Sequence, residues 1–124
     1  KKNKKKSIPL PVSAPFHCSL MKSASDKMKE KIKKVNFQTP SPSIITNVTA
    51  KPESNPENIK NILIEQIYSK VRWRESILFM INNGITDFVE IGPGKVLSGL
   101  VKRINANNNS ISINTINDVK SIIK

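Results

Sequence analysis

The sequence has one cysteine, one histidine and few glycines, and each scarcity excludes a class of protein. Cys18 alone cannot form an internal disulfide or supply the paired thiolates of a zinc site, so we expect a reducing compartment, by default the cytoplasm. Four glycines and eight prolines in 124 residues exclude collagen and Pro/Gly-rich disordered chains. No apolar run approaches the roughly 18 residues of a membrane-spanning helix. One modest globular unit, or part of one, is the expectation.

Acidic residues are also scarce: 9 Asp plus Glu stand against 21 Lys plus Arg, for a formal charge of +12. This charge favours an acidic partner, whether nucleic acid, anionic lipid or protein. The alternative is a compositional bias that leaves solvated surface lysines, because isoleucine and asparagine are abundant as well. The aromatic residues are scattered and not interleaved with arginine, which argues against nucleic-acid binding.

Hydrophobic periodicity predicts helices that alternate with short strands. Spacings of three and four predict helices over residues 19–34, 56–67, 73–83 and 96–104. Short apolar runs predict strands over residues 43–48, 85–91 and 111–116. A loop is expected over residues 51–55, where Asn55 would be the N-cap of the helix that begins at Pro56. Gly84 is expected to end a helix as a left-handed C-terminal cap, and Asp118 to open a short last helix.

These elements indicate the α/β class. The helical connections are long enough to return the chain to the same sheet edge, so we expect the three strands to pair in parallel. Such a small sheet has unpaired edges, and the apolar faces exceed what these residues can cover alone. The five lysines within residues 1–6, followed by prolines, predict a basic connecting segment over residues 1–9, and the folded unit is expected over residues 10–124.

Candidate chemistry centres on His17, which lies in a loop before the first predicted helix and outside any apolar stripe. The position suits a general base, but also an ordinary polar surface residue. Cys18 follows directly, and adjacent residues rarely aim both side chains at one substrate atom. We therefore expect a small buried thiol at Cys18 and not a nucleophile.

The turn over residues 92–95 (GPGK) is similar to a phosphate loop only superficially, because the Walker spacing is absent and Leu97 replaces the third glycine of a dinucleotide fingerprint. We interpret it as a strand-to-helix turn, with an anion at the exposed helix N-terminus as the alternative. The sequence contains no G-x-S-x-G nucleophile motif and no cluster of metal-ligating residues, so no metal is expected.

Five motifs, taken in order, carry a resemblance to one family. They are LPVSAPFHCSLM at residues 10–21, ITNV at 45–48, Gln66, VRW at 71–73 and EIGPGKVL at 90–97. Together they resemble malonyl-CoA:acyl carrier protein transacylase, from about Ile8 to the end of the chain, and only its C-terminal segment. The resemblance implies a partial α/β-hydrolase-like acyltransferase core, with a short parallel sheet flanked by helices, incomplete without the N-terminal part. Residues 1–9 would then end a small subdomain.

In this family a serine takes malonyl from coenzyme A as an ester and passes it to the acyl carrier protein in fatty acid biosynthesis. The resemblance implies that His17 is the catalytic histidine. Gln66 matches the residue whose main-chain carbonyl accepts the other imidazole N–H. Phe16 matches a position whose side chain influences which acyl group fits the site. A bulky ring at this position resembles the malonyl-preferring members of the family. No cofactor is implied, since malonyl-CoA is a substrate.

The resemblance also implies that the serine, its oxyanion loop and the arginine for the malonyl carboxylate lie upstream of Lys1. Residues 1–124 alone are therefore expected to be inactive. The implied partners are malonyl-CoA, acyl carrier protein and a nucleophile-bearing N-terminal half, on this chain or a separate one; no nucleic acid or membrane is implied. The alternative is a non-catalytic remnant or a carrier-protein-binding module.

Overall fold

The computed structural model describes residues 13–123, so the predicted connecting segment at residues 1–9 lies outside the described residues. The elements, in chain order, are the 3-10 helix η1 (Ser19–Met21), α1 (Lys22–Lys34), β1 (Ile44–Ile45), β2 (Pro52–Glu53), α2 (Pro56–Gln66), α3 (Trp73–Asn82), β3 (Asp87–Ile91), α4 (Val96–Ile104), β4 (Asn109–Ile113) and α5 (Ile116–Ile122). No helix among residues 13–123 is both long and apolar enough to cross a membrane.

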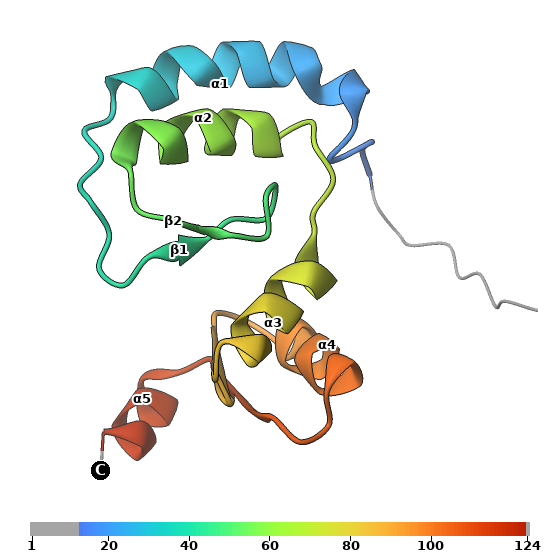
Figure 1. The fold of residues 1–124 in the computed structure, drawn as a ribbon, viewed down its shortest axis with the longest axis vertical. Helices are drawn as coiled ribbons and strands as arrows, with labels where there is room; N and C mark the ends of the chain where they lie inside the picture. The colour runs from blue at the N-terminus through green and yellow to red at the C-terminus, as the bar shows by residue number, and fades with distance from the viewer. Residues whose placement is uncertain (1–12, 124) are drawn as a thin grey trace, which may run out of the picture.

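The first half of the structure is built on α1 and α2, which lie side by side, with the β1–β2 hairpin next to α2 (Figure 1). The start of α2 is as the sequence predicts. The Asn55 side chain accepts hydrogen bonds from the amides of Glu57 and Asn58, at 2.9 and 3.1 Å. Pro56 is tolerated in the first turn because its missing N–H would have no helical partner there. The inner side of α2 then buries Ile59 and Ile64.

One strand prediction was wrong. The apolar run at residues 43–48 contributes only the two-residue strand β1, which pairs antiparallel with β2, where a loop was expected. A tight reversal causes this: the Ala50 amide donates to the Thr46 carbonyl at 2.9 Å, and Ala50 has a φ of 55°. A reversal this short can only close a hairpin, because a parallel return needs a crossover of a dozen or more residues.

The second half contains the predicted parallel sheet. Strands β3 and β4 pair in parallel, in register from Asp87 with Asn109 to Ile91 with Ile113, and α4 forms the crossover between them. Helices α3 and α4 cover one face, where Ile77 and Val101 are only 1% and 3% exposed. The α/β class with a short parallel sheet is therefore confirmed.

Two helix boundaries in this half are set by local chemistry. Gly84 follows α3 with a φ of +86°, the left-handed conformation predicted for it, and its amide donates to the Ile81 carbonyl at 3.0 Å. Helix α5 begins earlier than expected, because Thr115 is its N-cap. Asp118 completes the capping box from the third helical position.

Candidate active site

The loop that carries His17 holds this residue in an unusual conformation. His17 is exposed and has a φ of +58°, in the left-handed region that non-glycine residues rarely adopt. That backbone costs roughly 1–2 kcal/mol for an L-residue, so the surrounding turns must impose it. The Phe16 amide donates to the Ala14 carbonyl on one side, and the Met21 amide donates to the Cys18 carbonyl on the other, at 2.9 and 3.0 Å.

The imidazole of His17 is bonded to a main-chain group far along the chain. Its Nδ1 lies 2.9 Å from the carbonyl oxygen of Gln66, which is 49 residues away in sequence. A carbonyl oxygen can only accept, so Nδ1 carries the hydrogen, and in the neutral form of the ring the lone pair is on Nε2. The contact therefore orients the ring and leaves Nε2 free to accept a proton.

The Gln66 carbonyl is available because Gln66 is the last residue of α2, where the final carbonyls have no partner within the helix. The chain then turns, and the amides of Tyr68 and Ser69 both donate to the Glu65 carbonyl, at 3.1 and 3.0 Å. This leaves the Gln66 oxygen for His17.

Helix α1, which follows the His17 loop, is attached to α2 by two further contacts. The hydroxyl of Ser25, a fully buried residue, donates to the Ile64 carbonyl at 2.9 Å. The Lys22 ammonium lies 4.6 Å from the centre of the Tyr68 ring, a cation–π contact. These contacts hold the loop before α1 against the end of α2.

The two neighbours of His17 differ in their surroundings. Phe16 is 55% exposed, so its ring is available to a ligand or to another part of a protein. Cys18 is half-buried, and its thiol donates to the Pro15 carbonyl at 3.1 Å within the same loop. Cys18 is thus tied into the loop as a structural residue.

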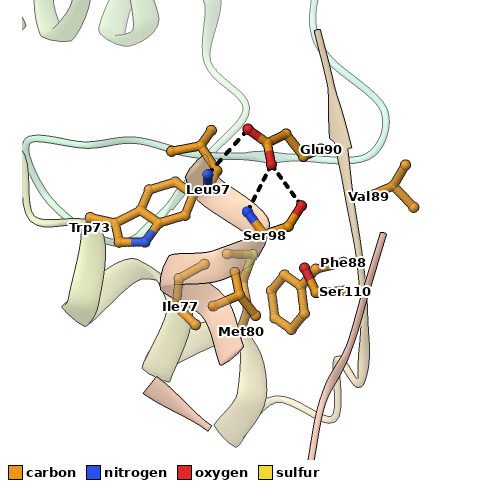
Figure 2. Close-up of a pocket in the computed structure, with 10 residues that line it drawn as sticks. Trp73, Ile77, Met80, Phe88, Val89, Glu90, Leu97, Ser98 and Ser110 are labelled. Carbon is orange, nitrogen blue, oxygen red and sulfur yellow. Dashed lines mark hydrogen bonds between the residues drawn. The ribbon is translucent and has the colours of Figure 1, made fainter. Parts of the chain in front are cut away.

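The predicted turn at residues 92–95 contains no free anion site at the start of α4. Glu90 accepts hydrogen bonds there from the amides of Leu97 and Ser98, at 3.1 and 2.8 Å, and from the Ser98 hydroxyl, at 2.6 Å (Figure 2). The bonds from the Ser98 hydroxyl and amide, and the weaker one from Leu97, lower the pKa of Glu90. The anion alternative was therefore wrong, because a carboxylate of the chain itself occupies the helix N-terminus.

Sequence reasoning missed this role of Glu90. The available signal was an acidic residue at the end of a strand, just before a glycine turn and a helix that lacks a capping side chain of its own. Within the turn, Gly92 and Gly94 have φ values of +136° and +100°, which only glycine adopts readily. The turn is structural and lies apart from the His17–Gln66 pair in sequence.

A mainly apolar cavity of about 260 Å³ lies between α3, α4 and the sheet (Figure 2). Two of its lining atoms, Trp73 Nε1 and Ser110 Oγ, are buried without a hydrogen-bond partner. His17 is not part of its lining. Among residues 13–123, no group of three His, Cys, Asp or Glu side chains is placed to hold a metal ion.

Comparison with known proteins decides the family. The malonyl CoA-acyl carrier protein transacylase of Bacillus subtilis is 48% identical over 109 residues, which are 88% of this chain and 34% of that protein. A crystal structure of an acyl carrier protein S-malonyltransferase from Vibrio cholerae superposes with a TM-score of 0.87 at 40% identity, over 95% of this chain and 39% of that one. This chain belongs to the malonyl-CoA:acyl carrier protein transacylase family. The resemblance carried by the motifs is therefore confirmed.

The chain spans about a third of the length of the curated relatives it matches, consistent with the C-terminal segment that its motifs indicate. A third similar structure is a complex of a type II polyketide acyl-carrier protein with its malonyl-transacylase. The match has 38% identity and a TM-score of 0.85, and it covers 94% of this chain and 38% of the matched chain. No family model matches the sequence.

Proposed function

We propose that this chain supplies the histidine-bearing part of an enzyme that transfers malonyl from malonyl-CoA to acyl carrier protein through a seryl ester. The observation that carries the proposal is the 2.9 Å contact between His17 Nδ1 and the Gln66 carbonyl, in a chain of the transacylase family. It gives an exposed imidazole whose Nδ1 is held by a main-chain carbonyl and whose Nε2 is free. This is the arrangement that a general base requires.

In the proposed first step, His17 Nε2 removes the proton of a serine hydroxyl as its oxygen attacks the thioester carbonyl of malonyl-CoA. The new C–O bond forms, the C–S bond breaks, and the imidazolium returns the proton to the departing coenzyme A thiolate. The second step repeats the sequence with the carrier's thiol as the attacking group and the serine as the leaving group. The Gln66 carbonyl accepts the Nδ1 hydrogen throughout and stabilises the charged ring.

The serine must come from outside residues 1–124, since this sequence contains no G-x-S-x-G motif. A base accelerates only a nucleophile that it can reach, so residues 1–124 alone should not transfer malonyl. The nucleophile-bearing part belongs on the same polypeptide or on a second chain.

Acyl carrier protein is the proposed partner and Phe16 the proposed selectivity residue. The partner is supported by the similar structure of a malonyl-transacylase in complex with its acyl-carrier protein. The formal charge of +12 on this chain also suits an acidic carrier protein. Phe16 directly precedes His17 and leaves 55% of its surface open, so a bound acyl group next to the imidazole would meet its ring.

The test is a chimera in which residues 1–124 replace the matching third of the Bacillus subtilis enzyme. Incubated with malonyl-CoA and carrier protein, the chimera should produce carrier with the added mass of one malonyl group, whereas residues 1–124 alone should produce none. A folded chimera that binds carrier without ever malonylating it would contradict the proposal and would favour a carrier-binding module.

A further inference from the structure

Lys22 and Tyr68 make a contact beside the His17–Gln66 pair. Lys22 is the first residue of α1, and Tyr68 lies just beyond the last residue of α2. The start of α1 and the end of α2 lie at the same end of this helix pair (Figure 1). The Lys22 ammonium lies 4.6 Å from the centre of the Tyr68 ring, within the range of a cation–π attraction. The two segments that meet at the imidazole are therefore joined a second time.

The ammonium of Lys22 is also held by its own helix. Its Nζ lies 3.2 Å from Oδ1 of Asp26, one turn further along α1. Both side chains are more than half exposed, so this ion pair contributes little stability by itself. It does restrict a long side chain, because the carboxylate and the aromatic ring bind the same ammonium. A flexible lysine thereby makes a directed contact with the end of α2.

The connections between the two contacts are hydrogen-bonded turns. On the α1 side, the connection is η1, which the Met21 amide closes by donating to the Cys18 carbonyl at 3.0 Å. On the α2 side, the Tyr68 amide donates to the Glu65 carbonyl at 3.1 Å. Turns closed in this way transmit a displacement and absorb little of it. A shift at the cation–π contact should therefore move the imidazole relative to its acceptor.

The imidazole needs this support. The backbone of His17 has an unfavourable φ of +58°, and its ring is exposed, with one hydrogen bond to Gln66. A general base works only within hydrogen-bond reach of the proton that it removes, and a small misplacement of a reacting group costs rate.

We propose that Lys22 is a positioning residue for His17 and acts through the ring of Tyr68. The inference rests on the proposed function, since it concerns the rate at which His17 serves as a base. Lys22 touches no reacting atom in this role; it fixes the loop that carries the imidazole.

Removal of the charge at Lys22 in the folded chimera with the Bacillus subtilis enzyme tests the proposal. Lys22→Met keeps the side-chain stem, and it should slow single-turnover serine acylation about tenfold at saturating malonyl-CoA, with unchanged affinity for malonyl-CoA. Lys22→Arg restores a cation over the ring and should keep the parent rate. Lys27→Met, at an exposed position of the same helix, is the matched control and should also keep it.

The His17→Ala background separates a positioning role from a general structural one. Because Lys22 is proposed to act only through the imidazole, K22M should not slow H17A further. Tyr68→Leu should reproduce the effect of K22M, whereas Tyr68→Phe, which keeps the ring, should not. The double variant K22M/Y68L should be no slower than the slower single variant, since both changes remove the same contact.

A K22M variant that acylates at the parent rate would overturn the proposal, as would equal slowing by K22M in the parent and in H17A. An unchanged saturating rate with weaker binding of malonyl-CoA would also overturn it, because Lys22 would then be a substrate contact. If Y68L fails to fold, K22M and K22R decide the question, since Lys22 is exposed. Near-normal acylation by H17A would overturn the proposed function together with this inference, whereas a slow H17A beside a K22M of parent rate would overturn this inference alone.

Discussion

The hydroxyl of Ser25, a residue of α1 with no exposed surface, donates to the carbonyl oxygen of Ile64 on α2 at 2.9 Å. Ile64 lies two residues before Gln66 on the last turn of α2, and Ser25 lies on the helix that follows His17. The bond therefore helps to set the spacing at which the imidazole meets its main-chain acceptor.

Replacing Ser25 by alanine should destabilise the fold by about 1 kcal/mol, because the Ile64 carbonyl loses a partner in a site without water access. Urea denaturation of the chimera measures the change. Ser23→Ala, at an exposed position of the same helix, is the matched control and should be near neutral. Equal stability of the two variants would show that the buried bond contributes nothing.

His17→Ala in the chimera should slow serine acylation by about 10²- to 10⁴-fold, the usual contribution of a general base, with unchanged stability. Single-turnover formation of the malonyl-enzyme measures it. Gln66→Ala is the informative companion: it keeps the main-chain carbonyl that His17 uses, so its rate should stay within a few-fold of the parent. Near-normal acylation by H17A would remove His17 from the mechanism.

Phe16→Ala should relax acyl selectivity. If the ring limits the room beside His17, its removal should raise the kcat/KM ratio of methylmalonyl-CoA to malonyl-CoA by on the order of tenfold, the scale set by one methyl group in an apolar pocket. Competition between the two thioesters, read by carrier mass, measures the ratio. Leu20→Ala, which removes an even more exposed apolar side chain nearby, is the control. An unchanged ratio for F16A would assign Phe16 to packing alone.

Glu90→Gln should lower stability in a pH-dependent way. Hydrogen bonds from Ser98 and Leu97 hold the pKa of Glu90 below its ordinary value of 4.5, so the ionised form is favoured in the folded state. This contribution is fully present above pH 4.5 and is lost as the pH falls through the lower folded-state pKa. The stability gap between parent and E90Q should therefore be constant near neutral pH and close in acid. Glu30→Gln, on the exposed side of α1, should show no such gap.

Local signals in the sequence predicted most element boundaries. Asn55 with Pro56 begins α2 and Gly84 ends α3, because caps and positive φ values depend on a few neighbouring residues. Pairing was harder to predict. The partner of β1 was missed because β2 includes a proline and has no apolar alternation of its own.

The candidate site shows the same division. The five motifs read together, with the one around His17 first, indicated the family and the residue types involved, because each motif is a local property of the chain. Glu90 was missed because its function depends on where α4 returns over the strand, which is a property of packing.

The sequence by itself determined the helices, the capped ends and the membership of a transacylase family, since each depends on residues close together in the chain or on motifs in order. The resemblance implied that the Gln66 carbonyl accepts from the His17 ring, but only the tertiary structure showed the 2.9 Å contact across 49 residues, and the exposure of Val89, Ile91 and Ile111 on β3–β4. The physical reason is that both depend on how helices and strands pack, and the packing of distant segments is not encoded in any short stretch of the chain.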